Sequence, residues 1–537
     1  MMKYGKKWIS CLLVLVLAFA MGSTAFATTV EVSGDKDNLL ADHTFEAYQV
    51  FKGDESDGVL SNVEWGTGIN SNAFLTALKE NGDYGFRFSD DPSTGQVNEE
   101  CKTAADVADV LSKNSTDDAL ARAVAEIAFE NKSEIKTPLS VGENTLEAGY
   151  YLIVDTTDVS GENKVQNAAL LQVVGDVVQI NVKTDWPTLD KQIKHNETGS
   201  WGVVGDNQIG DTVEFRTITT VPDTTYYTAY TYTITDTMSE GLTSNVKTAG
   251  DLKILVNDTT KLDAEYYSVE ADGNTFNLTI DIKSAVAANV MRAGDSLYTY
   301  YSGVLNENAK IYDNGKEENT AYLTYSNEPN GSGTGKTPEE KVYDWTFKMG
   351  IHKVTKNADG TDKSLTGAKF VLSENSGLEV KNMGLQDGVP QNTDGLIALI
   401  ANSDGTYTVP PAGYVGELTY VIEAGSATIN GLDDATDYYL YETKAPDGYN
   451  LLSEPVKFTI TAAYTEDGSA LSDGKPTVVV GTEASSATLS ASIVNKAGSN
   501  LPETGGTGTT LFYIVGGILV IGAAVLLITR KRMNSEK

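Results

Sequence analysis

The stretch DYYLYETKAPDGYN, residues 437–450, places an acidic side chain on an apolar face of a predicted β-strand. Successive side chains of a strand point to opposite faces, so Tyr438, Leu440 and Glu442 share one face. A buried carboxyl group without a partner is energetically costly. We therefore expect polar partners for Glu442 on other strands of the same domain.

Two other strands of this C-terminal region each direct one polar side chain toward the same core. Lys353 shares its face with apolar residues in the first strand, and Asn495 does so in the last strand. These neighbours are Met349, Ile351, Ala491 and Ile493. The conservative interpretation is a buried lysine–glutamate ion pair with a nearby asparagine.

A reactive interpretation accounts for all three residue types. Burial lowers the pKa of a lysine and raises that of a carboxylic acid, so a buried pair can exist as free amine and protonated acid. The amine is then a nucleophile, and the acid can polarise the asparagine carbonyl and move protons as ammonia leaves. Folding holds the groups together, so an amide cross-link between the first and last strands can form without a separate enzyme.

The middle of the chain repeats this set of residues with different spacing. The alternation of faces places Lys191 on an apolar face of its first strand, Asp236 in a middle strand and Asn319 in a late strand. Asn327 shares the face of Asn319 and is the alternative partner for the lysine. The same trio in two domains is hard to attribute to chance.

The N-terminus has the layout of a secretory signal peptide. Lys3, Lys6 and Lys7 precede the apolar run 8–22, and the small-residue sequence Ala25-Phe26-Ala27 follows. We expect residues 1–27 to be removed on export.

The C-terminus combines a short motif, an apolar segment and a basic tail. The motif is Leu501-Pro502-Glu503-Thr504-Gly505. Residues 511–529 are long and apolar enough to cross a bilayer, and the basic tail 530–537 favours a cytoplasmic end. In this order the three parts resemble the cell-wall sorting signal of Gram-positive surface proteins. The resemblance implies that a sortase cleaves between Thr504 and Gly505, so the protein is the substrate of that transpeptidase.

Composition excludes several functions. The chain has 537 residues and a formal net charge of −34, which argues against nucleic-acid binding. With three histidines and two cysteines, the chain offers too few ligands for a Cys/His zinc site and no credible Ser/His/Asp set for a hydrolase. The loop NADGTDKS around Asp359 does not match a calcium loop. We therefore expect no cofactor, no metal site and no enzyme activity beyond single-turnover self-cross-linking, although the sequence does not exclude bound calcium.

Three domains are expected between the two ends. They cover residues 28–185, 186–330 and 342–498, and the Gly- and Pro-containing stretch EPNGSGTGKTPEEK, residues 328–341, is predicted to be a linker. The first domain combines strands with the helical pattern of residues 103–132, which is interrupted at Lys113-Asn114-Ser115.

Several motifs resemble those of sortase-assembled Gram-positive backbone pilins. YYLYETKAPDGY, SIVNK and Lys353 resemble a Cna-B-type domain, and the first of these resembles the pilin E-box. WPTLDKQ, TITDTMSEGL and ENTAYLTYSNEP resemble the isopeptide-forming middle domain, and AYQVFKGD extends the resemblance into the first domain. The resemblance implies mainly β, tandem immunoglobulin-like (Cna-A/Cna-B-type) β-sandwich domains, with helices added to the first. It also implies the linkages Lys191–Asn319 with Asp236 and Lys353–Asn495 with Glu442.

The first domain departs from the pattern. Aligning GYYLIVD with DYYLYET puts Val154 at the position of Glu442, and Asp155 lies one residue later on the opposite face. We therefore expect no intramolecular amide there.

In pilins of this kind, a sortase joins one subunit to a lysine near the end of the first domain of the next. The usual Tyr-Pro-Lys pilin motif is absent, and INVKTDWP stands in its place. The alternation of faces predicts that Lys183 is exposed, so it is the expected acceptor, with Lys194 as the alternative.

The function implied by these features is a shaft subunit of a covalent pilus on the wall of a Gram-positive bacterium. The expected partners are pilin-type and housekeeping sortases, other copies of the chain, accessory pilins and peptidoglycan. The alternative is a monomeric wall-anchored adhesin that uses the same domains as a stalk.

Overall fold

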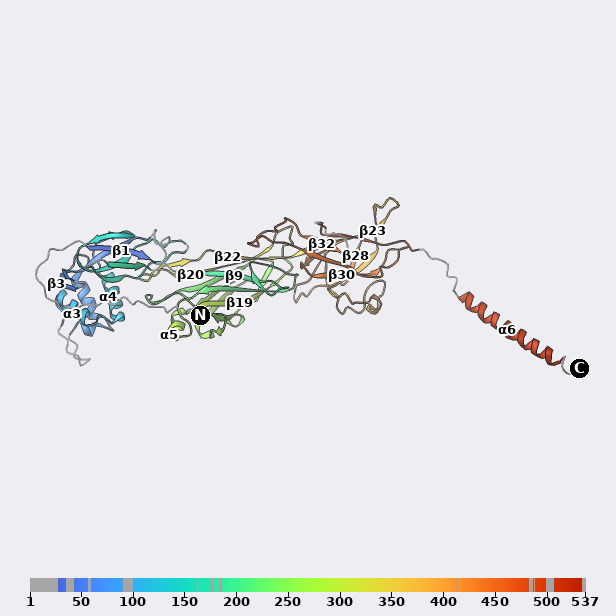
Figure 1. Cartoon of the computed structure of the whole chain (residues 1–537), viewed down its shortest axis with the longest axis horizontal. Coiled ribbons are helices and arrows are strands. Elements are labelled where there is room, and N and C mark those ends of the chain that lie inside the picture. Colours follow the sequence, from blue (N-terminus) through green and yellow to red (C-terminus); the bar gives the residue numbers. More distant parts are fainter. Residues whose placement is uncertain are drawn as a thin grey trace, which may run out of the picture.

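Three β-rich units follow one another along an elongated molecule, and a single helix stands apart from them at the C-terminal end (Figure 1). The computed structural model describes residues 28–34, 43–56, 59–89, 100–161, 163–174, 178–182, 186–411, 413–481, 486, 488–498 and 507–533. The predicted signal peptide, the sorting motif 501–505 and Lys183 lie outside these residues.

The first unit packs a small sheet of order β5-β1-β8 against a larger sheet of order β3-β2-β6-β7, with β4 also paired to β2. The strands are β1 Thr28–Gly34, β2 Phe45–Ser56, β3 Val59–Trp65, β4 Thr137–Leu139, β5 Gly142–Leu146, β6 Gly149–Asp155, β7 Leu170–Val174 and β8 Val178–Val182. β1 runs parallel to β8, so the first and last strands of this unit lie side by side. β6 is buried along its whole length because the small sheet covers one face and helices cover the other.

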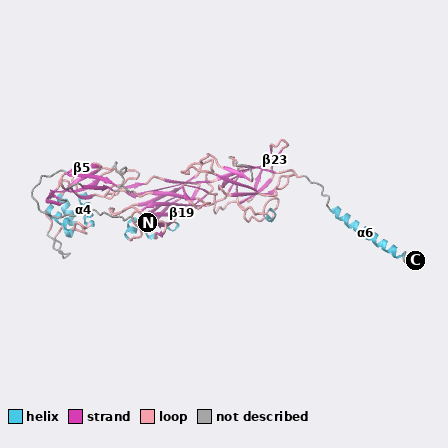
Figure 2. Ribbon diagram, in the orientation of Figure 1, coloured by secondary structure: helices cyan, strands magenta, loops and turns pink. Residues whose placement is uncertain are grey.

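Helices of the globular units are concentrated in this first unit (Figure 2). They are α2 Ser71–Glu80, the short 3-10 turn η1 Gly85–Arg87, α3 Ala104–Lys113 and α4 Asp118–Glu130. A capping box between Thr103 and Asp106 starts α3, and the Asp117 side chain accepts a hydrogen bond from Leu120 N to start α4. The predicted interruption near Lys113 is confirmed, while α2 was not anticipated.

The middle unit is a sandwich of two larger sheets. One has the order β10-β9-β12-β19-β15-β16 with β14 paired to β19, and the other has the order β11-β22-β20-β13-β18-β17 with β21 paired to β20. The strands are β9 Leu189–Lys194, β10 Trp201–Gly202, β11 Val204–Asp206, β12 Thr212–Thr220, β13 Tyr232–Met238, β14 Leu242–Ser244, β15 Lys253–Val256, β16 Thr260–Lys261, β17 Tyr267–Asp272, β18 Thr275–Ile280, β19 Ser296–Leu305, β20 Glu317–Ser326, β21 Thr334–Lys336 and β22 Glu340–Trp345. The short helix α5 Ile282–Ala287 and the 3-10 turns η3 Ala249–Asp251 and η4 Ala264–Tyr266 connect some of them.

The prediction of a linker at residues 328–341 was wrong. The Gly-rich segment turns the chain back so that β21 pairs with β20, with Thr324 opposite Lys336, and β22 then pairs with the other part of β20. The middle sandwich therefore continues to Trp345. The Gly and Pro content that suggested a linker instead belongs to the turns between these strands.

The third unit is a smaller sandwich that starts immediately after β22. Its sheets have the orders β24-β23-β29-β27-β26, with β33 paired to β23, and β28-β25-β30-β31-β32. The strands are β23 Phe347–Lys356, β24 Asp362–Ser364, β25 Ala368–Ser373, β26 Ile400–Ala401, β27 Thr406–Thr408, β28 Ile422–Ala424, β29 Ser426–Leu432, β30 Asp437–Lys444, β31 Val456–Thr461, β32 Thr477–Val480 and β33 Ser490–Val494, and η5 Val380–Met383 is a 3-10 turn. The expectation of tandem, mainly β sandwich domains with helices in the first is confirmed.

The middle and third units share one continuous buried apolar cluster. The backbone N–H of Ile209 in the middle unit donates to Gly431 O in the third, at 3.1 Å. The helix α6 Thr507–Met533 follows, and its segment Ile514–Lys531 has a mean hydropathy of 2.0 and is long enough to cross a membrane. The structure thus joins two sandwiches firmly and leaves α6 outside their core.

Candidate functional site: two buried lysine sites

The third unit brings its predicted trio together in the interior. The first strand, β23, runs parallel to the last strand, β33, with Lys353 opposite Ile493. Asn495 follows two residues later and therefore faces the same side of the sheet. Glu442 reaches this point from β30 in the opposite sheet. The exposed fractions of Lys353, Glu442 and Asn495 are 0%, 2% and 1%, so water has almost no access to the three groups.

The contacts among these three groups orient the asparagine amide. Lys353 Nζ donates to Asn495 Oδ1, and it also donates to Ile493 O at 3.0 Å. Asn495 Nδ2 donates to the two carboxylate oxygens of Glu442 at 2.9 and 3.0 Å. Lys353 Nζ lies 3.5 Å from Glu442 Oε1. The amine therefore lies beside the carbonyl of the amide, and the acid lies beside the nitrogen that would leave.

The surroundings fix the acid and the amide further. Leu452 N donates to Glu442 Oε2 at 2.8 Å, and Asn495 Nδ2 donates to Asn450 O at 3.0 Å. Asn450 and Leu452 lie in the loop that follows β30, so this loop closes over the site. The amide of Asn495 is thus held with its orientation defined on both its oxygen and its nitrogen side.

The middle unit also gathers its lysine and acid in the interior, and a third side chain contacts both of them. Lys191 on β9 and Asp236 on β13 come from opposite sheets and form an ion pair. The hydroxyl of Tyr301 on β19 contacts both of them. Asp236 and Lys191 are 0% and 2% exposed, so this is a closed site like that of the third unit.

Asn319 lies on the strand next to Asp236. β20 pairs with β13 in a register that puts Asn319 opposite Met238, two residues beyond Asp236. Asn319 is 1% exposed, and neither its Oδ1 nor its Nδ2 forms a hydrogen bond of regular geometry in the described part of the chain, although the amide is close enough to Tyr301 to oppose the rise in the pKa of that hydroxyl. A buried amide with neither group in a regular hydrogen bond is unusual in folded proteins, so it calls for a specific role.

The alternative asparagine occupies a different place. Asn327 Nδ2 donates to Val159 O of the first unit at 3.1 Å, and Asn327 O accepts from Gln166 N at 2.8 Å. Asn327 therefore holds the first and middle units together at the end of β20. Of the two asparagines, Asn319 is thus the one that lies beside the Asp236 segment of β13.

Sequence reasoning missed Tyr301. Along β19 the buried positions alternate with half-buried ones, and Tyr301 occupies a buried position. That alternation is readable from the sequence, but the strand offers several tyrosines, and the sequence alone does not show which one meets Lys191. Two neighbouring aromatic rings, Phe215 and Phe276, pack against Tyr301 and hold its hydroxyl in place.

Burial sets the electrostatics of both sites. Desolvation lowers the pKa of Lys191 and of Lys353, and the nearby Asp236 and Glu442 each oppose that shift. Desolvation, with the negative charge of Asp236, raises the pKa of Tyr301 well above its usual value. Each lysine is thus biased toward the neutral amine, which is the nucleophilic form.

The corresponding region of the first unit carries no lysine. Val32 on β1 faces Ile180 on β8, and both pack in an apolar cluster with Ile153 of β6. Val154 packs on the other face of β6, against the helices. These positions therefore contribute to an ordinary apolar core.

Asp155 is nevertheless buried at the end of β6. It is 3% exposed, and its Oδ2 lies 3.0 Å from His43 Nδ1 and accepts from Asn167 Nδ2 at 2.9 Å. Asp155 Oδ1 accepts from Thr157 N at 3.0 Å. These hydrogen bonds keep the pKa of Asp155 below its usual value although burial opposes the shift. Both carboxylate oxygens of Asp155 therefore have hydrogen-bond partners without a lysine.

Of the two candidate acceptor lysines, the structure describes one. Lys194 is the last residue of β9, is half-buried and forms an ion pair with Glu214. Lys183 lies outside the described residues.

Comparisons with known proteins agree with this organisation. Residues 350–470 match the model of the SpaA family, a prealbumin-like fold domain, and residues 493–535 match the LPXTG cell wall anchor motif. "Fimbrial subunit type 1" of Actinomyces viscosus is 30% identical over 319 residues, and the "Trypsin-resistant surface T6 protein" of Streptococcus pyogenes is 26% identical over 344 residues. Each alignment covers 56% of this chain. It covers 55% of the fimbrial subunit and 60% of the T6 protein, so the chain matches a little over half the length of these relatives.

Solved structures of pilins are also similar. The three-domain T6 backbone pilin of Streptococcus pyogenes aligns with 89% of this chain and 100% of its own, at 15% identity and a TM-score of 0.48. The matched anchor and the relatives locate the protein at the cell wall of a Gram-positive bacterium. The chain thus combines a SpaA-type prealbumin-like domain over residues 350–470 with an LPXTG cell wall anchor motif over residues 493–535, and over about half of its length it is similar to a fimbrial subunit and to a surface T6 protein.

Proposed function

We propose that this protein is the shaft subunit of a covalent pilus and that each subunit is stiffened by two intramolecular amide bonds. The bonds join Lys191 to Asn319 and Lys353 to Asn495. The observation that carries this proposal is the closed arrangement in the third unit, where the lysine amine contacts the amide oxygen and Glu442 accepts from the amide nitrogen.

The chemistry needs only the three side chains. The neutral amine of Lys353 attacks the Cγ atom of Asn495, and the carbonyl electrons move to Oδ1. A proton passes from Nζ through Glu442 to Nδ2, the Cγ–Nδ2 bond breaks, and ammonia leaves. The product is an Nζ–Cγ amide, and Glu442 ends in the protonation state in which it began. Asp236 would perform the same proton transfer in the middle unit.

The cross-links would change how the subunit carries load. β23 and β33 are parallel neighbours at the two ends of the third domain, so pulling on the chain ends would load the covalent bond instead of the sheet hydrogen bonds. The closed loop also restricts the unfolded chain, as a disulfide does. A fibre exposed to shear benefits from both effects.

The intact mass of the folded protein tests the internal bonds. We expect a mass lower than the sequence mass by two ammonia molecules. Glu442→Ala should restore one of them, whereas Glu454→Ala removes an exposed carboxylate from the same unit and should restore none. A full sequence mass for correctly folded protein would refute the cross-links.

Assembly between subunits requires a second reaction. We propose that a sortase cleaves after Thr504 and transfers the resulting acyl group to Lys183 of another copy, and that a wall-anchoring sortase attaches the fibre to peptidoglycan. Denaturing gels of cell-wall extracts should show a high-molecular-weight ladder that Lys183→Ala abolishes and Lys194→Ala preserves. A single band in the unmodified strain would support a monomeric adhesin instead.

A further inference from the structure

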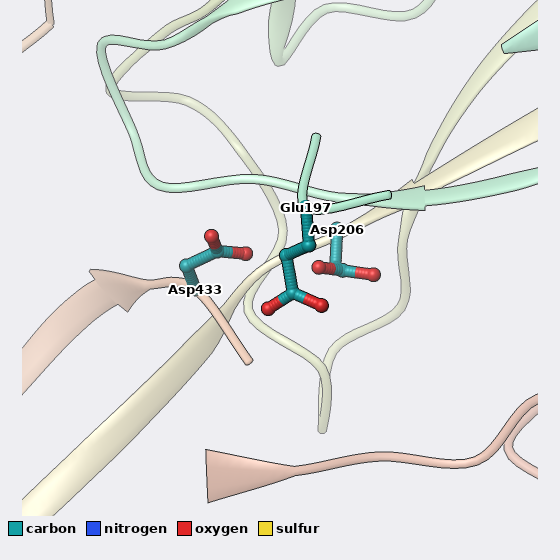
Figure 3. Close-up of side chains that lie close together, drawn as sticks. All are labelled: Glu197, Asp206 and Asp433. Carbon is teal, nitrogen blue, oxygen red and sulfur yellow. The ribbon is translucent and has the colours of Figure 1, made fainter. Parts of the chain in front are cut away.

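A group of carboxylates lies at the junction of the middle and third units, away from both lysine sites. Glu197 is in the turn between β9 and β10, Asp206 ends β11, and Asp433 directly follows β29. Figure 3 shows that the three carboxylates converge, and at least one oxygen of each lies within 4.8 Å of one oxygen of each other residue. Two of the residues belong to the middle unit and one to the third.

The negative charge at this junction has one histidine, and no lysine or arginine, as a basic partner among the described residues. Among the described residues, no lysine or arginine forms an ion pair with these three carboxylates; the nearest basic group is His195, whose Nε2 lies 3.5 Å from Asp206 Oδ2. Asp434 is a further buried acid beside them.

The two buried carboxylates each leave one oxygen without a partner. Asp206 is 0% exposed and Asp433 is 6% exposed, yet Oδ1 of each receives no hydrogen bond from the described part of the chain. The second oxygens are held by neutral donors. Asn196 Nδ2 donates to Asp433 Oδ2 at 2.7 Å, and the Tyr464 hydroxyl lies 3.4 Å from Asp206 Oδ2. This is the arrangement of metal ligands: one oxygen free to bind, and the other oriented by a neighbouring donor.

We propose that Glu197, Asp206 and Asp433 bind one calcium ion that ties the middle unit to the third. Carboxylate oxygens are hard ligands, which suit calcium or magnesium and not a metal that prefers nitrogen or sulfur. Calcium–oxygen distances are about 2.3–2.6 Å, so oxygens on opposite sides of one ion are at most about 5 Å apart. The oxygens lie within 4.8 Å of one another, which fits that limit. Magnesium is less suited to the site because it demands near-ideal octahedral geometry and usually keeps several of its waters.

The surroundings allow an ion to enter and to act as a bridge. Glu197 is exposed, so the group opens to solvent on one side, where waters can complete the coordination. The junction already has hydrogen bonds across it, such as the one from the Tyr438 hydroxyl to Gln208 Oε1 at 3.2 Å. A divalent ion would replace repulsion among the carboxylates by attraction to a common charge, and would thereby stiffen the joint between the two sandwiches. This proposal is independent of the amide bonds and of polymerisation.

Calcium titration of the purified full chain in detergent tests the proposal. After removal of metal with a chelator, calorimetry with calcium chloride should show one saturable site per chain, with a dissociation constant on the order of 10⁻⁴–10⁻³ M, as in extracellular modules. Asp206→Asn combined with Asp433→Asn should abolish binding, and Glu197→Gln should weaken it about tenfold. The control variant Asp394→Asn removes an exposed charge from the third unit and should leave calcium binding unchanged.

Thermal unfolding gives a second measurement, in which the difference in unfolding temperature between Asp433→Asn and the unmodified chain should depend on calcium. In chelator, Asp433→Asn should unfold at the same temperature as the unmodified chain or higher, because it relieves repulsion. With saturating calcium the unmodified chain should gain stability and this variant should not, and an equal concentration of magnesium should give a smaller gain. Absence of saturable calcium binding, or equal binding by the unmodified chain and the Glu197→Gln variant, would overturn the proposal.

Discussion

The first and third units place a valine and a lysine at equivalent points of the same arrangement. In each unit the first strand runs parallel to the last within one sheet. The strands pair Val32 with Ile180 in the first unit, and Lys353 with Ile493 in the third. The first unit fills this position with apolar side chains, and the third fills it with an amine, an acid and an amide. The topology therefore accommodates either an apolar core or a buried amine, acid and amide, and the residues at a few inward positions decide between them.

Replacing the lysine of the third unit should make it resemble the first. Lys353→Met keeps most of the side-chain volume and removes the nucleophile, so no amide can form. The cross-link would close a loop between positions 142 residues apart. By analogy with a disulfide of similar span, its loss should lower the free energy of unfolding by about 5 kcal/mol. Chemical denaturation together with intact mass would measure this.

The control for that variant is a change of a surface lysine in the same strand. Lys356→Met replaces a partly exposed side chain that pairs with Asp362, and it should cost less than about 1 kcal/mol. If both variants unfold alike and have the same mass, no covalent bond distinguishes the third unit from the first.

A pair of asparagine variants sharpens the comparison in the middle unit. Asn319→Ala should restore one ammonia to the mass, because Lys191 would lose its partner. Asn327→Ala should leave the mass unchanged, because that side chain contacts Val159 of the first unit. Peptide mapping after proteolysis would identify the linked pair, and a reversed result would assign the bond to Asn327.

Inserting a lysine into the first unit tests whether the fold alone can produce the reaction. Val32→Lys would bury an amine in the apolar cluster that contains Ile180 and Ile153, while the buried acid of this unit, Asp155, is already bound to His43, Thr157 and Asn167. We expect a loss of about 3 kcal/mol in unfolding free energy and no change in mass other than the substitution itself. Denaturation and mass spectrometry would check both. Loss of ammonia in this variant would show that parallel end strands and a buried acid are sufficient.

The smallest effect is expected at the residue that sequence reasoning missed. Tyr301→Phe removes the hydroxyl that contacts both Lys191 and Asp236 but keeps the ring. We expect the middle cross-link to form about tenfold more slowly, equivalent to about 1.4 kcal/mol in the barrier, while the third-unit bond forms at its usual rate. A time course of intact mass after refolding would separate the two. Equal rates in the variant and the unmodified chain would limit Tyr301 to packing.

The amino-acid sequence by itself determined that particular polar residues of the middle and third units are buried. The alternation of faces has a period of two and is a local property, so it placed Lys191, Lys353, Glu442 and Asn495 inward before any fold was known, and each is buried. The LPXTG anchor motif matched near the C-terminal end is also a local pattern. The helix interruption near Lys113 followed from spacing alone.

Only the tertiary structure decided which buried groups meet. Tyr301 reaches Lys191 from a strand 110 residues away, and the turn at residues 329–333 forms a hairpin where composition suggested a linker. The carboxylates of Glu197 and Asp206 in the middle unit converge with that of Asp433 in the third. Such contacts depend on sheet order and on how two sandwiches pack, and local periodicity carries no information about either.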